Sequence, residues 1–209
     1  MEQRTVTRAY NFELRAENDE RNGDHIVGRP IVYNSKTNLG WFDEIIEGGA
    51  LDEANLKDVR FLVNHNTDMI PLARSRNNNA NSTMQMIVDS EGMSIRVNLD
   101  TENNSEARNL YSAIKRGDIT GMSFMFSIDD EEWEDLQSDH PTRHIRKIGT
   151  VLEVSAVTFP AYEATEISAR DKEALDSAKA TLESVRSRTL DSEKAALELE
   201  KAKLRNKFF

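Results

Sequence analysis

Short apolar segments that alternate with turn residues make up most of the chain, and this pattern most constrains the fold. Within the segments, apolar and polar side chains recur with a period of two, which is typical of strands that bury one face. The segments lie at residues 5–15, 26–33, 41–46, 59–63, 84–88, 93–99, 122–128, 143–148 and 151–159. A turn formed by Ser90, Glu91 and Gly92 joins two of them and predicts a hairpin. So many short strands predict a mainly β domain.

One segment carries a helical period instead. Between residues 105 and 115 the apolar positions are Ala107, Leu110, Tyr111 and Ile114. Ser105 is placed to cap the N-terminus of this helix, and Gly117 follows its C-terminus. A shorter helical turn is expected at residues 51–56, and loops are expected at 66–81 and 129–139. The sequence therefore predicts an α+β fold, in which a β-barrel or sandwich is flanked by helices.

From about residue 169 the composition changes. No glycine, proline or aromatic residue occurs until Phe208, and glutamate, lysine, arginine and alanine dominate. Apolar residues keep a heptad-like spacing at Leu175, Ala178, Leu182 and Val185 and, after a break near 187–189, at Leu190, Leu197 and Leu204. A short coiled coil and a lone charged helix both fit this pattern. We therefore expect a domain at residues 1–168 and a charged helical tail at 169–209.

Composition narrows the classes of function. The chain of 209 residues has a formal net charge of −10, which disfavours nucleic-acid binding because that needs a concentrated positive patch. The absence of cysteine excludes disulfides, thiolate metal sites and a cysteine nucleophile, and it fits a reducing cytoplasm. No run approaches the ~20 apolar residues of a membrane helix, and the N-terminus lacks the apolar core of a signal peptide. We expect a soluble intracellular protein with no membrane partner.

Three strand-like segments offer the parts of a catalytic triad. Ser123 lies near the start of one apolar run, His65 ends another, and Glu153 lies inside a third. A serine hydroxyl is a weak nucleophile at neutral pH and needs a base, usually an imidazole. The imidazole in turn needs an acceptor on its other nitrogen, which fixes the tautomer and stabilises the cation formed in the transition state. These three residues lead to the hypothesis of a serine protease.

Each of the three residues also has a purely structural interpretation. Ser123 could be a strand serine that faces water or bonds its neighbours, and His65 could be an ordinary histidine of the core or its rim. Glu153 alternates with Leu152 and Val154, so it faces the opposite side of its strand. If that side is solvent, the carboxylate has no special role, but if it lines a barrel end, the carboxylate must be paired.

Other chemistries fit the sequence less well. His140 and His144 have the spacing of a metal-binding pair on a helix, but Pro141 lies between them and no third ligand is evident. A strand continues after Ser123, so the Gly-x-Ser-x-Gly turn of α/β esterases is absent. No glycine-rich loop suited to phosphate occurs. We therefore expect neither a metal nor a cofactor.

Four stretches occur together in a specific order. They are residues 42–51, a strand ending in Asn64-His65-Asn66, Gly121-Met122-Ser123-Phe124, and residues 152–161. As a set they resemble the HK97-type prohead (procapsid maturation) proteases of tailed bacteriophages, and the resemblance covers about residues 5–168. It implies a β-barrel surrounded by helices, similar in fold to the herpesvirus assembly proteases.

The resemblance also implies the roles of individual residues. Ser123 would be the nucleophile and His65 the general base. The herpesvirus relatives use a second histidine as the third member, whereas here we expect Glu153, because a carboxylate can also accept the imidazole N–H. His144 is the reserve candidate for that place. Arg74, in the loop after His65, could support a bound water or a substrate carbonyl.

The family resemblance further implies a serine endopeptidase that acts inside the immature capsid, or prohead, in the host cytoplasm. Its substrate would be the major capsid protein or a scaffolding segment of it, and it would cleave itself. The tail could then bind scaffold or capsid protein, pair with a second copy, or be removed by self-cleavage. The alternative is a non-enzymatic capsid assembly or scaffolding protein on the same fold.

Overall fold

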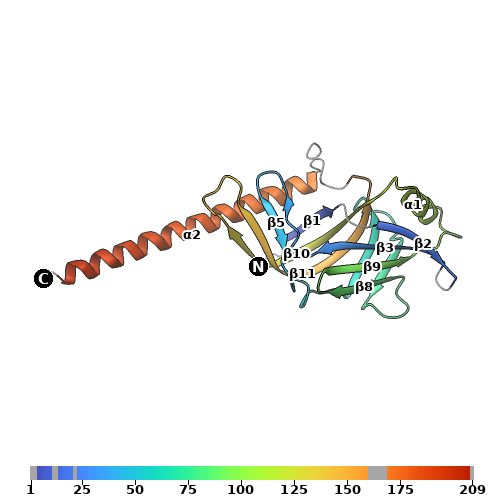
Figure 1. Cartoon of the computed structure of the whole chain (residues 1–209), viewed down its shortest axis with the longest axis horizontal. Helices are drawn as coiled ribbons and strands as arrows, with labels where there is room; N and C mark the ends of the chain where they lie inside the picture. Colours follow the sequence, from blue (N-terminus) through green and yellow to red (C-terminus); the bar gives the residue numbers. More distant parts are fainter. Residues whose placement is uncertain (1–3, 11–13, 21–22, 160–168, 208–209) are drawn as a thin grey trace.

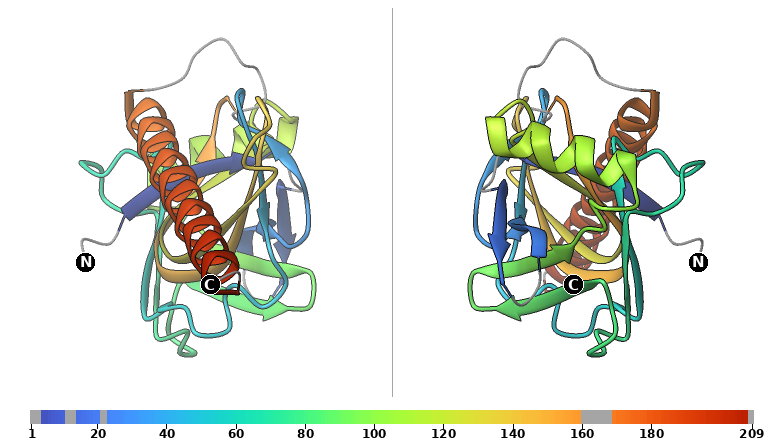
Figure 2. Two further views of the ribbon diagram at one scale, coloured as in Figure 1. Left: turned by 90° about the vertical axis from the view of Figure 1, so that its left-hand side faces the viewer. Right: turned by 90° about the vertical axis from the view of Figure 1, so that its right-hand side faces the viewer.

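Two sheets form the body of the protein, one short helix lies at one end, and one long helix extends away from the other (Figures 1 and 2). The structure is a computed structural model that describes residues 4–10, 14–20, 23–159 and 169–207. The strands are β1 (Arg4–Tyr10), β2 (Leu14–Asp19), β3 (Gly23–Val32), β4 (Thr37–Asn38), β5 (Asp43–Ile46), β6 (Asp58–Val63), β7 (Ala73–Arg76), β8 (Met84–Asp89), β9 (Gly92–Asn98), β10 (Gly121–Glu134) and β11 (Thr142–Val157). The helices are α1 (Ser105–Arg116) and α2 (Ala169–Lys207).

The larger sheet is organised around β11. In the order β1-β10-β11-β5-β4, β11 pairs antiparallel with β10 over almost its whole length of 16 residues. Its first residues also pair in parallel with β5, and its last residues pair in parallel with β6, which carries β7 as a further neighbour. One long strand therefore holds two separate parallel partners in fixed register.

The smaller sheet has the strand order β2-β3-β9-β8, and all of its pairings are antiparallel. The predicted hairpin across Ser90, Glu91 and Gly92 is its β8–β9 pair. Apolar side chains from both sheets and from α1 meet in one core, which includes Ile26, Met93, Leu110, Phe61 and Phe124. The two sheets therefore stabilise each other by burying their apolar faces together.

Helix α1 follows its predicted apolar stripe, but its cap differs from the prediction. The side chain of Asn104, not Ser105, accepts hydrogen bonds from the backbone N–H groups of Glu106 and Ala107. At the other end Gly117 has a φ of 80°, a left-handed conformation that a residue without Cβ adopts at no steric cost. The shorter helical turn expected at residues 51–56 is only a turn.

Two strands are longer than predicted, and they pair with each other. The expected break between 148 and 151 is absent, because Gly149 continues β11 beside β10. A Cβ atom at Gly149 would lie 2.2 Å from the Asp129 carboxylate, so this glycine permits a close approach rather than a turn. The register shifts near this point, and β10 runs on through the acidic residues expected to form a loop.

Strand β1 belongs to the larger sheet and β2 to the smaller one. The single strand expected at residues 5–15 is two strands, β1 and β2, on different sheets. The loop expected at 66–81 contains β7, a four-residue strand with two arginines whose composition hides it. Residues 160 and 161, the end of the fourth stretch that carries the resemblance, lie outside the described residues.

Helix α2 rests on the body only through its first half. Leu175, Ala178, Leu182 and Val185 pack on a small cluster around Phe42 and Trp133. The Arg186 guanidinium donates to the main-chain oxygens of Leu136 and Ser138, at 2.5 and 3.0 Å. Beyond this point the helix extends away from the sheets (Figure 1), and Leu190, Leu197 and Leu199 are 48–58% exposed. The helix has no break at 187–189.

The prediction of a mainly β, α+β fold with a C-terminal charged helix is confirmed. The strand pairings within the described ranges make two open sheets and not one closed ring, so the barrel is less complete than the resemblance implied. The division into a domain at residues 1–168 and a tail at 169–209 stays a prediction, although α2 begins at Ala169.

A buried network of charges ties β1 and β5 to the long strands. Glu44, 1% exposed, accepts hydrogen bonds from Arg8 and from Arg143, and Arg143 also pairs with Glu131. Burial opposes ionisation of Glu44, but the two guanidinium groups outweigh it and hold the pKa of this carboxyl below its usual value. The ionised carboxylate therefore contributes to stability once the arginines are buried beside it.

We predict that Glu44→Gln lowers the free energy of unfolding at pH 7 by about 3 kcal/mol, because it leaves Arg8 and Arg143 short of their counter-ion. Since the folded-state pKa is lowered, the stabilisation is full above about pH 4.3, the unfolded value, and is lost as pH falls through the folded pKa. Urea unfolding at a series of pH values should show the gap between wild type and variant closing on acidification. Glu53→Gln is the control, because the Glu53 side chain that pairs with Lys147 is 79% exposed. This variant should change the free energy of unfolding little.

The packing of α2 on the cluster around Phe42 and Trp133 leads to a second prediction. Both tryptophans of the chain, Trp41 and Trp133, belong to the cluster that α2 covers. A chain that ends at Thr189 should keep the wild-type fluorescence maximum and unfolding midpoint. A chain that ends at Ser168 should show red-shifted fluorescence and lose about 3 kcal/mol, because it exposes this cluster to water. Equal destabilisation by both truncations would mean that the distal half of α2 also holds the fold.

Candidate active site

The turn after β6 positions His65. Asn64 and His65 both have left-handed backbones, with φ of 51° and 55°, and non-glycine residues seldom adopt this region. The Asn64 side chain accepts from the Thr158 backbone N–H at 2.9 Å and donates to its hydroxyl at 3.1 Å. The Asn64 backbone N–H donates to the oxygen of Ala156 at 2.9 Å. The end of β11 therefore holds this unusual turn in place.

His65 and Glu153 form a close pair. Nδ1 of His65 lies 2.5 Å from Oε1 of Glu153. Because a carboxylate can only accept, Nδ1 carries the proton, and in the neutral ring Nε2 then carries the lone pair. The Glu153 side chain is 4% exposed and that of His65 is 18% exposed. Glu153 therefore faces a partner and not solvent.

Ser155 joins the same group of residues, although the sequence interpretation gave it no role. Its hydroxyl donates to Oε2 of Glu153 at 2.5 Å and accepts the backbone N–H of His65 at 3.2 Å. Ser155 lies two residues after Glu153 on β11, and side chains at this spacing share one face of a strand. The spacing of two residues from Glu153 is a signal in the sequence that could have indicated Ser155.

Ser123 lies on the neighbouring strand, directly opposite Ser155 in the β10–β11 pair. Opposite residues of an antiparallel pair project on the same face, with Cβ atoms about 5 Å apart. Ser123 is fully buried, and its hydroxyl donates to the main-chain oxygen of Arg8 on β1 at 2.7 Å. The fold thus places Ser123 opposite Ser155, which bonds both His65 and Glu153, and the Ser123 proton is directed to β1.

These positions contain the groups that acyl transfer needs. A buried carboxylate orients an imidazole, and a serine hydroxyl lies one strand away on the same face. The strand order explains the arrangement: β6, β11 and β10 are adjacent, so three segments distant in sequence meet at one end of the sheet.

The reserve candidate His144 lies elsewhere on β11. It is nine residues before Glu153, which is about 30 Å along a strand. Its Nδ1 lies 3.1 Å from Glu47 and its Nε2 lies 3.2 Å from Glu134. His140 pairs with Asp43 at 2.9 Å. These contacts with carboxylates do not join the group around His65.

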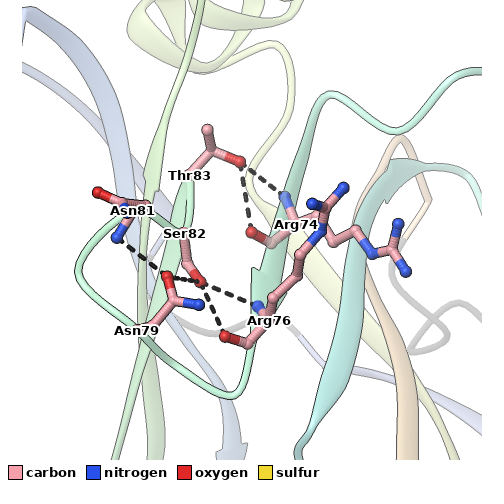
Figure 3. A pocket seen from close by; sticks show the side chains of 6 residues that line it. All are labelled: Arg74, Arg76, Asn79, Asn81, Ser82 and Thr83. Atoms are coloured by element: carbon pink, nitrogen blue, oxygen red, sulfur yellow. Dashed lines mark hydrogen bonds between the residues drawn. The ribbon is translucent and has the colours of Figure 1, made fainter.

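Arg74 is engaged in the sheet. Its guanidinium donates to both carboxylate oxygens of Asp58 at 2.6 and 2.7 Å, and these bonds lower the pKa of Asp58. Arg74 and Arg76 line a hollow between β7 and the loop before β8, but their guanidinium groups extend away from Asn79 and Asn81 (Figure 3). Thr83 and Ser82 bond the main chain of the two arginines there. The hollow is a strand junction, and it lends no support to a role for Arg74 in binding a substrate carbonyl.

Within residues 4–10, 14–20, 23–159 and 169–207, no three histidine, aspartate or glutamate side chains gather in a way that could hold a metal ion. In the same part of the chain, no helix combines the length and apolar character needed to cross a membrane.

The contribution of the two side-chain hydrogen bonds between Asn64 and Thr158 can be tested without disturbing the backbone. Glycine tolerates a φ of 51°, so Asn64→Gly removes the two side-chain hydrogen bonds to Thr158 and little else. We predict a loss of about 1–2 kcal/mol in urea unfolding. Asn77→Gly is a matched control, because Asn77 has a similar φ of 53° and an exposed side chain. If both variants lose the same free energy of unfolding, the hydrogen bonds between Asn64 and Thr158 contribute nothing to stability.

Comparison with known proteins identifies the family. Among solved structures, the chain is similar to the capsid assembly protease of bacteriophage T4, with 14% identity and a TM-score of 0.40 over 74% of this chain and 99% of that chain. No curated protein matches the chain. The family model of the caudovirus prohead serine proteases matches residues 10–180, which include the segments that carry His65, Ser123 and Glu153. Because this match covers most of its length, the chain belongs to the caudovirus prohead serine protease family.

Proposed function

We propose that this serine peptidase cleaves the major capsid protein or its scaffolding segment inside the prohead, with Ser123, His65 and Glu153 as its triad. Family membership gives the reaction class, peptide-bond hydrolysis by a serine enzyme in capsid maturation. The observation that supports the residue assignment is the 2.5 Å contact between His65 and Glu153, beside the strand of Ser123. A buried carboxylate on an imidazole is the arrangement that prepares a general base.

In the proposed reaction, Nε2 of His65 takes the proton of the Ser123 hydroxyl as its oxygen attacks the scissile carbonyl. The imidazolium that forms is stabilised by Glu153, which already holds Nδ1–H. The same imidazolium then donates its proton to the leaving amine, and an acyl-enzyme remains on Ser123. Water, deprotonated by His65, completes the hydrolysis.

The hydrogen bond between Ser123 and Arg8 is characteristic of a resting state of the enzyme. The hydroxyl proton is given to the main-chain oxygen of Arg8, and Ser123 has no exposed surface. For attack, the hydroxyl has to leave Arg8 and donate to Nε2 of His65, and the residues that cover it have to move. Such a resting state suits a protease that must not act before the shell has assembled.

The proposed partners follow from the location of the substrate. We propose the host cytoplasm, inside the immature capsid, as the place of action, and the enzyme itself as a second substrate. The distal half of α2 extends from the body with exposed leucines (Figure 1). We propose it as the segment that binds capsid or scaffold protein, or that pairs with a second copy of the chain.

The central test compares wild type with Ser123→Ala. We predict that the wild type shortens itself, cleaves co-expressed capsid protein and reacts with a fluorophosphonate. Ser123→Ala should lose at least about 1,000-fold in cleavage rate, because the nucleophile is gone. Intact-mass measurement over time gives both rates and the cleavage sites.

The matched control is Ser127→Ala. Ser127 is also a buried serine of β10, but its hydroxyl accepts the backbone N–H of Thr150 at 2.9 Å. The Ser127→Ala variant should cleave at the wild-type rate. Cleavage and labelling that persist in Ser123→Ala would refute the assignment of Ser123, and labelling of Ser155 in its place would identify a different nucleophile.

A further inference from the structure

We propose that Ser155 is a positioning residue of the active site, which holds Glu153 and His65 in their productive arrangement. This inference rests on the proposed function, because it concerns the same catalytic pair. Ser155 does not touch the reacting bond in this account. It acts on catalysis through its two hydrogen bonds, one to the side chain of Glu153 and one to the main chain of His65.

The first bond fixes the carboxylate. Oε1 of Glu153 accepts Nδ1–H of His65, and Oε2 accepts the Ser155 hydroxyl, each at 2.5 Å. Both oxygens thus have a fixed donor, so the plane of the carboxylate is set. A carboxylate with one fixed donor can still rotate about its last bond, whereas one with two cannot. Because Glu153 and Ser155 lie on the same strand, this anchoring is built into β11.

The second bond fixes the backbone that carries the base. The hydroxyl proton of Ser155 is given to Glu153, so a lone pair of the same oxygen is available for the backbone N–H of His65. His65 has the left-handed φ of 55°, which the chain seldom adopts without outside support. One hydroxyl therefore ties the main chain of the base to the side chain of its orienting acid.

The surroundings make this link rigid. Ser155 is fully buried, and it pairs in fixed register with Ser123 on β10 and with Leu62 on β6. A buried hydrogen bond to a carboxylate is stronger than the same bond in water. Removal of the Ser155 hydroxyl takes this hydrogen bond away from Oε2 of Glu153 and from the backbone N–H of His65. Losing a hydrogen-bond partner is costly at a buried position.

The test uses Ser155→Ala, with Ser127→Ala as the matched control. Both changes delete a buried serine hydroxyl that accepts a backbone N–H in the same sheet. Only Ser155 also contacts the catalytic pair. The full-length protein is assayed for kcat and KM on a capsid-protein peptide. In a Ser123→Ala background, which prevents self-cleavage, proton NMR follows the downfield Nδ1–H resonance of His65, identified by its absence in His65→Gln.

We expect Ser155→Ala to lower kcat about 100-fold, the scale of a small misplacement of a catalytic group, with KM within about twofold of wild type. The Nδ1–H resonance should move upfield or broaden beyond detection. Ser127→Ala should leave both readouts unchanged. Should Ser155→Ala fail to fold, Ser155→Cys keeps the volume with a weakly bonding thiol and should give the same loss of kcat.

An unchanged resonance in Ser155→Ala, or a kcat within about twofold of wild type, would overturn the positioning role. An equal loss of kcat in Ser127→Ala would overturn it too, since the effect would then be one of general stability. If the wild type itself cleaves and labels nothing, the proposed function fails. The resonance then still decides whether Ser155 holds the pair of His65 and Glu153.

Discussion

The pairing of β11 with β10, β5 and β6 is the constraint on which the rest of the larger sheet depends. A strand of 16 residues is long for a globular protein, and twist would carry its two ends far out of plane. Register shifts in β10 near Asp129 and the close approach at Gly149 allow the pair to bend. The strand can therefore bind β5 with one end and β6 with the other.

The active-site geometry follows from this one register. Because β11 pairs in parallel with β6, the turn that carries His65 lies beside the last residues of β11, among them Glu153 and Ser155. Because β11 pairs antiparallel with β10, Ser123 lies opposite Ser155. A slip of one residue in either pairing would turn these side chains to the opposite face. The arrangement of the proposed catalytic residues therefore depends on backbone hydrogen bonds far more than on local sequence.

This dependence explains which features the sequence could predict. The period-two segments, the stripe of α1 and the residues His65, Ser123 and Glu153 lie in local patterns, and the structure brings those three residues to one end of a sheet. The break expected between residues 148 and 151 is wrong, because a glycine next to a polar residue looks the same in a turn and inside a strand. Short polar β7 has no apolar alternation to detect. Pairings between distant strands, such as β11 with β6, leave no periodic trace in the sequence.

The buried charges and Ser123, the proposed nucleophile, meet at Arg8. Burying Arg8, Arg143 and Glu44 costs desolvation energy that an apolar cluster of similar volume would not incur, so stability alone does not account for these charges. Their geometry does set the register of β1: a one-residue slip would move Arg8 to the other face and leave Glu44 underneutralised. That register in turn places the main-chain oxygen of Arg8 at the hydroxyl of Ser123. The charge network thus sets, through β1, the hydrogen bond between the Ser123 hydroxyl and the main chain of Arg8.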